Sequence, residues 1–346
     1  MDRGGAERVV LQLAEHAVAS GDRVAVASAG GVWVKDLTAM GVEHHYVPLQ
    51  RRSALGTLKA AAALRRAIRR ERPDIVHTHN VGVTAATRPA LATSRVRAGM
   101  LTTFHGVAPE DYKAAARALR WSSPRVVACS PAVGASLAAA GYPAGRIGVV
   151  TNAAGLEPAG EERLAAMRDR LGLDGRPLVV GFGRLAAQKA WPTLIEAAEG
   201  LEEADVVVAG AGPLQDELVA AAGASGSRVR FIGPVDDIPA LVGLASCVVS
   251  TSTWEGLPLS VLESLSLGKP VVATSVDGLA DIVSSDAVVL VPPGEPAAVR
   301  EALRGVLADP GLARRLGDAG LRLAQNWTVD AMLAGYRREY AGVLPA

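Results

Sequence analysis

Two glutamates eight residues apart, Glu255 and Glu263, carry the clearest chemical signal in the chain. Glu255 follows an apolar stretch and precedes Gly256, so we expect it in the turn between a strand and a helix. Glu263 falls one to two turns into the apolar helix that Pro258 opens, where a carboxylate needs a hydrogen-bonding partner. Two carboxylates facing one crevice suit a ligand rich in hydroxyl groups, such as a nucleoside joined to a sugar. A capped surface turn and a salt-bridged helical glutamate would give the same spacing.

A glycine turn with two cations follows the apolar stretch Leu178–Phe182. Gly183 and Arg184 form the turn, and Lys189 lies five residues beyond the arginine. Arginine can bind phosphate oxygens through two N–H groups, and lysine acts as a point charge. Such cations would stabilise the charge that develops on a departing diphosphate. Exposed turn residues are the alternative, because a glycine turn after a strand is common.

Glycines and histidines mark other turns. Gly4 and Gly5 open the first predicted helix, where free backbone N–H groups attract phosphate. Two predicted strands end in histidine loops, one with His79 and Asn80 and the other with His105. In parallel α/β proteins, ligands bind beyond these strand ends. The sequence contains no HExxH, paired CxxC or D-x-D pattern, so we expect no metal site.

These residues need rigid elements to position them, and a strand–helix rhythm runs along the chain. Many of the predicted strands are β-branched without alternation, which is typical of parallel strands buried on both faces. The predicted strands are 23–27, 74–78, 100–104, 126–129, 147–150, 178–182, 205–209, 229–232, 247–251, 270–274 and 287–291. We expect an α/β protein with two Rossmann-like domains, whose parallel sheets face a central cleft. The expected domains are residues 1–155 and 156–325, with a final helix, 326–346, returning to the first domain.

Length and composition exclude several classes. A chain of 346 residues fits two domains, and 49% apolar with 21% charged residues is not a disordered composition. No apolar run approaches the ~20 residues of a membrane-spanning helix, so we expect a cytoplasmic protein. Cys129 and Cys247 lie in apolar runs and should be buried free thiols. Aromatic residues make up 4%, without basic–aromatic interleaving, which argues against nucleic acid as a partner.

The charge is unevenly distributed along the chain. Residues 1–155 contain 20 basic and 10 acidic residues, whereas residues 156–346 contain 16 and 25. The positive excess peaks around the helical run Ser53–Arg70, which Arg51 and Arg52 precede. A basic amphipathic helix can lie on anionic lipid or meet an anionic substrate. An ordinary solvated helix face gives the same pattern.

Together these motifs resemble the retaining glycosyltransferases of family 4, which have the GT-B fold. The resemblance spans almost the whole chain and rests on Gly4–Arg8, Asp74–Asn80, Gly183-Arg184 with Lys189, and the Glu255/Glu263 pair. It implies transfer of a sugar from a UDP- or GDP-type sugar nucleotide to a hydroxyl acceptor, with retention and without a metal or cofactor. The acceptor stays open between a lipid-linked sugar, an inositol derivative and a natural product.

The resemblance also implies roles for individual residues. Glu263 would bind the ribose hydroxyls, and Arg184 and Lys189 the diphosphate. The catalytic set is then Glu255, Arg184, Lys189 and His105. The residues on the donor side are Gly4, Gly5, Gly183, Val235, Gly256, Leu257 and Glu263. On the acceptor side, the resemblance places His79 and Asn80.

The chain departs from the family at its first strand. In the family a central apolar strand precedes the glycine pair, whereas only Met1, Asp2 and Arg3 precede Gly4 here. We therefore expect the first sheet to show an open gap, or a strand from elsewhere that fills it. Two other functions fit the same architecture: a non-catalytic sugar-nucleotide-binding subunit, and an epimerase or phosphorylase.

Overall fold

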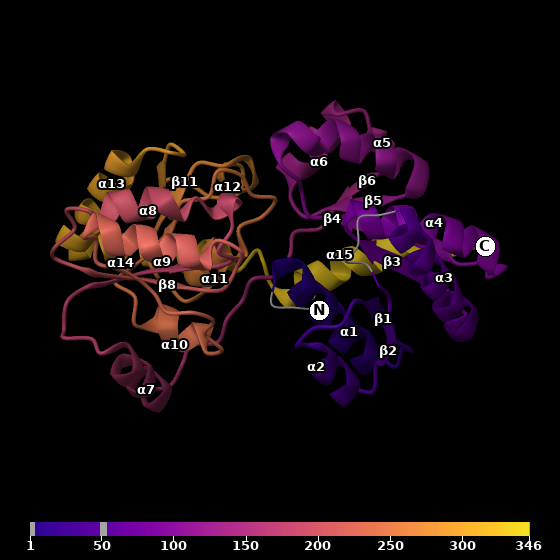
Figure 1. Ribbon diagram of the computed structural model, residues 1–346, viewed down its shortest axis with the longest axis horizontal. Coiled ribbons are helices and arrows are strands. Elements are labelled where there is room, and N and C mark those ends of the chain that lie inside the picture. The colour runs from indigo at the N-terminus through magenta and orange to yellow at the C-terminus, as the bar shows by residue number, and fades with distance from the viewer. Residues whose placement is uncertain (1–3, 49–53, 346) are drawn as a thin grey trace. The chain divides into compact units, whose positions relative to one another are not determined.

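The computed structural model describes residues 4–48 and 54–345, and it divides the chain into two compact units. Unit 1 comprises Met1–Ala153 and Val329–Ala346, and unit 2 comprises Ala154–Thr328. The last helix, α15 (Val329–Ala341), therefore belongs to the same unit as the first helix, α1 (Gly5–Ala19) (Figure 1). Each unit is a parallel sheet system covered by helices, as the strand–helix rhythm predicts.

Unit 2 contains one continuous sheet of six parallel strands in the order β12-β11-β10-β7-β8-β9. Its strands are β7 (Leu178–Phe182), β8 (Asp205–Ala209), β9 (Val229–Phe231), β10 (Cys247–Ser250), β11 (Val271–Thr274) and β12 (Val289–Val291). Every residue of β7, β10 and β11 is buried, which explains their unbroken apolar sequences.

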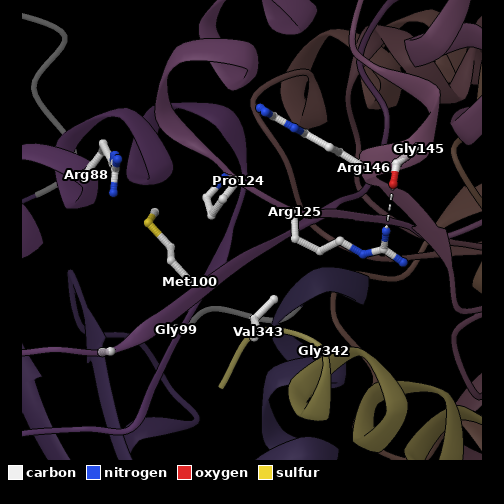
Figure 2. A pocket seen from close by; sticks show the side chains of 10 residues that line it. Arg88, Gly99, Met100, Pro124, Arg125, Gly145, Arg146, Gly342 and Val343 are labelled. Carbon is white, nitrogen blue, oxygen red and sulfur yellow. Dashed lines mark hydrogen bonds between the residues drawn. The ribbon is translucent and has the colours of Figure 1, made fainter. Parts of the chain in front are cut away.

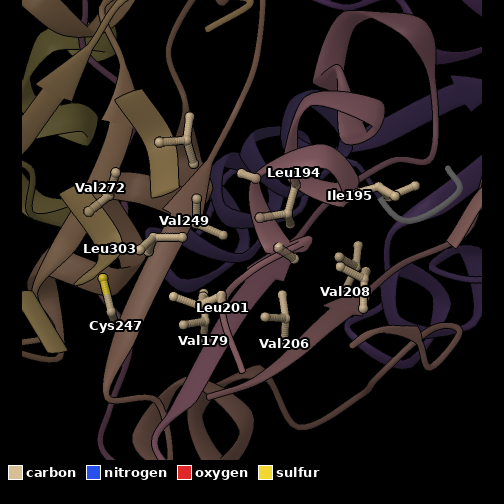
Figure 3. Packing of buried hydrophobic residues seen from close by; sticks show 14 of the residues in the cluster. Val179, Leu194, Ile195, Leu201, Val206, Val208, Cys247, Val249, Val272 and Leu303 are labelled. Atoms are coloured by element: carbon tan, nitrogen blue, oxygen red, sulfur yellow. The ribbon is translucent and has the colours of Figure 1, made fainter. Parts of the chain in front are cut away.

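Helices cover the sheet of unit 2 and bury its valines. They are α7 (Glu161–Leu171), α8 (Trp191–Ala198), α9 (Gln215–Ser225), α10 (Ile238–Gly243), α11 (Leu259–Ser266), α12 (Asp277–Ala280), α13 (Pro296–Ala308) and α14 (Pro310–Ala324). Figure 3 shows part of the core, in which Leu194 of α8 and Leu303 of α13 belong to one cluster with Val179 and Val249 of the sheet. Proline occupies the first turn of α8, α10, α13 and α14, where its missing N–H costs nothing.

Unit 1 contains two separate parallel sheets. One pairs β1 (Ala25–Ser28) with β2 (Glu43–Tyr46), and the other has the order β3-β4-β5-β6. The strands of the second sheet are β3 (Ile75–His79), β4 (Gly99–Phe104), β5 (Val126–Ala128) and β6 (Ile147–Val149). Within residues 4–48 and 54–345, no hydrogen-bonded ladder joins β1 to β3. The two sheets are therefore not joined within the described residues, and the open gap expected from the sequence stays a prediction.

The helices of unit 1 include one that the sequence marks as basic. They are α1, α2 (Val34–Ala39), α3 (Ala54–Glu71), α4 (Val81–Ser94), α5 (Tyr112–Ser122), α6 (Pro131–Ala139) and α15. The basic run forms α3, whereas Arg51 and Arg52, which precede it, lie outside the described residues. Strand β2 was missed by the sequence prediction, because Glu-His-His-Tyr is polar and the strand is only partly buried.

Helix α15 is bound firmly into unit 1. The Glu339 carboxylate accepts hydrogen bonds from Arg125 Nε at 2.6 Å and Nη2 at 2.9 Å, next to the start of β5. The Tyr336 hydroxyl lies 2.8 Å from Thr103 Oγ1 on β4. Gly335 packs against Val150, and a methyl group there would come within 3 Å of the valine side chain. The last helix thus completes the core of unit 1.

Candidate active site

The strand order of unit 2 reverses between β7 and β10. From β7 the chain continues to β8 and β9 on one side, and from β10 to β11 and β12 on the other. In open parallel sheets, ligands bind beyond the carboxyl ends of the strands at such a reversal. The loop after β7 carries Arg184 and Lys189, and the loop after β10 carries Glu255. The topology thus brings these predicted site residues to the expected edge of the sheet.

An ion pair joins the two loops across the reversal. Lys189 Nζ donates a hydrogen bond to Glu255 Oε1 at 2.5 Å, and the two side chains are 17% and 8% exposed. The same carboxylate accepts hydrogen bonds from Ser252 Oγ at 2.7 Å and Gln188 Nε2 at 3.2 Å. Three donors therefore fix the Glu255 carboxylate. The sequence prediction missed Gln188 and Ser252. The available signals were that Gln188 precedes Lys189 and that Ser252 follows the end of β10.

Backbone hydrogen bonds fix the loop after β7 against the loop after β10. The short helical turn η3 (Ala187–Lys189) offers two carbonyl acceptors to the β10 loop: Thr251 Oγ1 donates to the Lys189 carbonyl, and Thr253 N donates to the Gln188 carbonyl, each at 2.9 Å. Gly278, in the first turn of α12, lies so close to the Glu255 and Gly256 carbonyls that a Cβ there would clash with both. Glu255 therefore sits on a loop whose backbone is fixed from two sides.

Arg184 is the exposed cation of the site. Its guanidinium makes no hydrogen bond or ion pair with any residue that the structure describes, while its carbonyl accepts a hydrogen bond from Trp191 Nε1 at 3.0 Å. Gly183 before it has φ 149°, and its N–H donates to the Ala209 carbonyl at 2.9 Å. The backbone is anchored, and the charged end is available to a ligand.

The remaining donor-side residues of unit 2 lie in segments that follow β9 and β10. Glu263 is 7% exposed in α11, between Leu262 and Leu265, which are fully buried. Val235 is also 7% exposed and follows β9, where the Gly233 carbonyl accepts a hydrogen bond from Gly210 N at 2.9 Å. Gly256 and Leu257 are buried in the loop that carries Glu255. Burial of Glu263 among leucines agrees with the sequence, and its contact with a nucleotide stays a prediction.

Unit 1 brings three histidines together at the carboxyl ends of β3 and β4. His79 Nδ1 lies 3.1 Å from His105 Nε2, with the rings stacked at a centroid distance of 5.4 Å. His77 bridges Thr103 Oγ1 at 2.7 Å and the Tyr340 hydroxyl at 2.9 Å. The His79–His105 hydrogen bond needs one donor and one acceptor nitrogen, which neutral imidazoles provide. His77 was not predicted as a site residue, although it lies on the same strand as His79.

Burial keeps these histidines neutral. It lowers the pKa of His77 to about 3 and that of His105 to about 4, with a smaller contribution from His105 at His77. It lowers the pKa of His79 well below its ordinary value, and the neighbouring His77 and His105 add to the effect. At neutral pH, His105 can therefore exchange hydrogen bonds with a ligand hydroxyl but offers no positive charge.

The other predicted site residues of unit 1, Gly4, Gly5 and Asn80, are described by their backbone conformation and N–H groups. Gly4 is extended and precedes α1, which starts at Gly5 without a side-chain cap, so its first N–H groups need other partners. Asn80 has φ 79°, and its N–H donates to the Thr103 carbonyl at 3.3 Å. These residues, with His79 and His105, belong to unit 1, whereas the cations and glutamates belong to unit 2.

Two arginine-lined pockets lie away from the carboxyl ends of the strands in unit 1. One, of about 410 Å³, is shown in Figure 2; Arg125 and Gly99 place it at the amino ends of β5 and β4, with Arg88 and Arg146 on opposite sides. The other, of about 460 Å³, is lined by Arg69, Arg72, Ser94, Arg95, Val96 and Arg97. Neither of these pockets contains a predicted site residue.

Two kinds of feature are absent from the residues that the structure describes. Among the described residues, no group of three or more histidine, cysteine or acidic side chains has the geometry of a metal site. None of the helices within residues 4–48 and 54–345 combines the length and hydrophobicity that crossing a bilayer needs.

Comparison with known proteins identifies two matching segments. Residues 176–309 match Glycosyl transferases group 1, and residues 3–157 match Glycosyltransferase Family 4. Alpha-D-kanosaminyltransferase of Streptomyces kanamyceticus is 34% identical over 192 residues, covering 52% of this chain and 50% of that protein. The chain thus spans about half the length of that relative.

Two longer similarities cover nearly the whole chain. The lipopolysaccharide core biosynthesis glycosyltransferase LpsE of Rhizobium meliloti strain 1021 is 27% identical over 327 residues, covering 92% of this chain and 89% of that protein. The crystal structure of Anabaena HepE in complex with UDP-glucose superposes with a TM-score of 0.87 at 21% identity, covering 99% of this chain and 97% of that one. At 21% identity the superposition shows a shared fold only.

Proposed function

Because the chain belongs to the group 1 glycosyltransferases and has the GT-B fold, we propose that it transfers a sugar from a nucleoside-diphosphate sugar to a hydroxyl acceptor. We further propose that the transfer retains the anomeric configuration and needs no metal. One observation carries the proposal: the Lys189–Glu255 pair lies at the strand reversal of unit 2, on the loop that also presents the unpartnered Arg184. UDP-glucose bound to HepE supports a donor of the same chemical class.

In this proposal the donor lies against unit 2. Arg184 and Lys189 bind the diphosphate, Glu263 binds the ribose hydroxyls, and Val235 borders the base. Glu255 holds hydroxyls of the transferred sugar, with the backbone of Gly256 and Leu257. Gly4 and Gly5 contact the phosphates through backbone N–H groups, and Gly183, whose own N–H is bonded to the Ala209 carbonyl, lets the diphosphate come close because it has no side chain. His105 hydrogen-bonds the sugar as a neutral imidazole, and His79 and Asn80 lie on the acceptor side.

The proposed reaction takes place on one face of the sugar. The acceptor oxygen forms a bond to the anomeric carbon as the bond from that carbon to the diphosphate oxygen breaks, and the acceptor proton passes to the leaving phosphate. Negative charge grows on the diphosphate as it departs, and the Arg184 and Lys189 cations stabilise it without a metal. The protein otherwise contributes positioning, which Ser252 and Gln188 support by fixing the Glu255 carboxylate.

Ligand binding gives the first test. Melting temperature is measured with UDP, GDP, ADP and dTDP and their common sugar derivatives, since a ligand specific for the folded state raises it by mass action. The donor so identified is then incubated with acceptors, and NMR of the product determines the anomeric configuration. We expect the product to keep the anomeric configuration of the donor sugar. The rate of sugar transfer should be the same with and without EDTA. Inversion or a chelator-sensitive rate contradicts the proposal.

Incubation of the donor without an acceptor separates the alternatives. A glycosyltransferase should leave most of the donor intact, an epimerase should convert its sugar, and a phosphorylase should require inorganic phosphate. Binding without any turnover in the presence of acceptors indicates a non-catalytic subunit.

The two arginine-lined pockets of unit 1 favour an anionic binding partner. We therefore propose in addition a peripheral contact between unit 1 and an anionic membrane. Arg69, Arg72, Arg95 and Arg97 are exposed around one cavity, and their side chains make no ion pair within the described residues. Each basic residue near an anionic bilayer contributes about 1 kcal/mol. Because both cysteines are buried free thiols, we propose the cytoplasm as the compartment, with the contact at the inner membrane face.

Sedimentation with liposomes tests this contact. Vesicles containing phosphatidylglycerol should bind the protein and neutral vesicles should not, with binding that weakens as salt rises. The double variant Arg69→Ala/Arg97→Ala should weaken binding by roughly 30-fold, which corresponds to about 2 kcal/mol. The matched control is Arg168→Ala/Arg170→Ala, which removes two exposed arginines from α7 of unit 2. Equal losses in the two variants contradict a contact at the pockets.

A further inference from the structure

One of the two arginine-lined pockets of unit 1 also has apolar walls. It is the cavity of about 410 Å³ in Figure 2, which we call the β4–β5 pocket because it lies at the amino ends of these two strands. Four of its lining residues are apolar: Ala98, Met100, Pro124 and Val343. The other pocket has one apolar lining residue, Val96. A cavity of this volume, with apolar walls and a few polar groups, suits a small organic ligand.

Two of the three arginines in the β4–β5 pocket carry charge that no described residue neutralises. Arg125 is already engaged, because Nε and Nη2 donate to the Glu339 carboxylate and Nη1 donates to the Gly145 carbonyl at 3.3 Å. Arg88 and Arg146 are exposed, and neither guanidinium makes a hydrogen bond or ion pair with a residue that the structure describes. No aspartate or glutamate is among the described residues that line the pocket. The pocket therefore attracts anions.

The wall that follows α15 is tightly seated, so the pocket is formed before a ligand binds. Gly99, the first residue of β4, lies so close to Val343 that a Cβ there would clash with the Val343 carbonyl. Gly148 on β6 leaves room for the Glu339 carboxylate in the same way, since a Cβ there would clash with it. A cavity that is already formed costs a ligand little free energy of ordering.

The two exposed arginines approach the pocket from separate elements. Arg88 lies on α4, and Arg146 ends the short helical turn η2 (Ala144–Arg146). Figure 2 shows them on opposite sides of the pocket, with Met100 and Pro124 between them in the view. Guanidinium groups bind phosphate oxygens through paired N–H donors. Because the arginines are exposed and Met100 is buried, phosphate oxygens would lie at the mouth and a carbon body against Met100.

The β4–β5 pocket is separate from the predicted acceptor side of unit 1. Gly99 begins β4, and Thr103, whose hydroxyl lies 2.7 Å from His77 Nε2, is near the other end of the same strand. At about 3.3 Å per residue of a parallel strand, the pocket lies roughly 13 Å from the histidines. A small molecule in the pocket therefore occupies a site of its own.

We propose that the β4–β5 pocket binds a small organic phosphate, whose phosphate oxygens contact Arg88 and Arg146 and whose apolar body lies against Met100. The site goes beyond the proposed sugar transfer and does not depend on it. Binding also strengthens the docking of α15, because Val343, which follows that helix, lines the pocket. The ligand thus stabilises unit 1 by mass action.

Calorimetry with phenyl phosphate, inorganic phosphate and phenol tests the ligand class on the chain of 346 residues. Phenyl phosphate should bind roughly tenfold more tightly than inorganic phosphate, because its ring removes apolar surface of the pocket from water. Phenol, which has no charge, should not bind. Equal affinity for phenyl phosphate and inorganic phosphate, or no saturable binding of phenyl phosphate, overturns the proposal.

Matched variants locate the binding. Arg88→Ala/Arg146→Ala should weaken phenyl phosphate binding by roughly 100-fold, since charged hydrogen bonds are lost at both arginines. Arg69→Ala/Arg97→Ala removes two exposed arginines from the other pocket and should leave the affinity nearly unchanged. Equal losses in the two variants indicate diffuse electrostatic attraction and overturn the proposal. Arg184→Ala should retain the binding, and a loss there assigns it to unit 2 instead.

Methyl NMR of labelled methionine reports where the ligand lies. Met100 is the one methionine among the described residues that line the pocket. Phenyl phosphate should shift its methyl signal, whereas the signal of Met167, on α7 of unit 2, should stay in place. An unmoved Met100 signal at saturating phenyl phosphate overturns the proposal.

Vesicles containing phosphatidic acid form the second arm of the NMR experiment, because a lipid headgroup offers the same phosphate chemistry. A Met100 shift with phenyl phosphate supports a soluble ligand. A shift with the vesicles alone assigns the phosphate to a membrane lipid and overturns the proposal.

Discussion

Units 1 and 2 share a parallel α/β architecture but differ in how completely their strands are enclosed. In unit 2 the sheet is continuous, and β7 and β10 at its centre are buried along their whole lengths. In unit 1 the sheet is divided, and only one of the four residues of β1 is buried. The difference shows that the burial of a strand depends on both of its neighbours as well as on its own apolar sequence.

The two units also differ in the ionisable side chains that they carry. Unit 2 carries the Lys189–Glu255 pair and Arg184 at its strand reversal. All six histidines precede residue 154 and therefore belong to unit 1. Changes in unit 2 should thus alter donor chemistry without a pH signature from histidine, whereas changes at the histidines of unit 1 should also alter the stability of that unit.

Arg184→Ala should give the largest effect. Because this guanidinium would stabilise charge that grows on the leaving diphosphate, its loss should lower kcat by ~10²–10³. Steady-state kinetics with the identified donor measures the change, and Arg170→Ala on α7 is the exposed control in the same unit. An unchanged kcat in a folded Arg184→Ala protein removes this residue from the catalytic set.

Glu263→Ala should act on donor binding. Loss of a charged hydrogen-bonding partner for the ribose costs about 1.5–3 kcal/mol, so the KM for the donor should rise by roughly 10- to 100-fold while kcat changes little. Glu263→Gln, which keeps the shape of the buried side chain, guards against an effect on folding. A lower kcat with an unchanged KM contradicts the assignment to the ribose.

Acidification should destabilise unit 1 selectively. Burial lowers the pKa of His105 to about 4, whereas the unfolded chain titrates near 6.5, so stability is fully present above about pH 6.5 and is lost as the pH falls toward 4. At pH 5 one such histidine costs roughly 2 kcal/mol. Urea unfolding at pH 7 and pH 5, followed by hydrogen exchange in each unit, measures the loss.

His105→Gln isolates the histidine contribution from that of the carboxylates. The variant should show a smaller stability loss between pH 7 and pH 5 than the parent protein. An equal loss in both proteins, or a loss that falls on unit 2, contradicts the prediction.

Glu339→Gln should give the smallest effect. It weakens the two hydrogen bonds from Arg125 that hold α15 to the start of β5, at a cost of about 1 kcal/mol because glutamine keeps the shape and one acceptor. The expected loss is confined to unit 1, as read by exchange at β5 and β8. A loss in unit 2 would show that the two units unfold together.

Much of the fold could be predicted from the sequence, because buried parallel strands read as unbroken apolar runs. Strands β7 and β8 begin and end where the sequence predicted. Strand β2 could not be found this way, because Glu43–Tyr46 gains its strand conformation from pairing with β1 and not from an apolar pattern of its own.

The site was less predictable than the fold. Glycine turns and strand ends marked Arg184, Lys189 and Glu255, but the direct bond between Lys189 and Glu255 depends on β7 and β10 becoming neighbours, which no local pattern shows. The donors Ser252 and Gln188 were missed for the same reason. Sequence identified the chemical groups, and the sheet topology determined which of them meet.

Helix α15 has a consequence for how the protein is made. Unit 1 is discontinuous in sequence, so Tyr336 and Glu339 leave the ribosome only after all of unit 2 has been synthesised. Domains usually fold in order from the N-terminus during synthesis. Here every residue of unit 2 is synthesised before α15, so unit 1 waits for its last helix with Arg125 and Thr103 still lacking their α15 partners. The half of the chain that is translated first is therefore the half that finishes folding last.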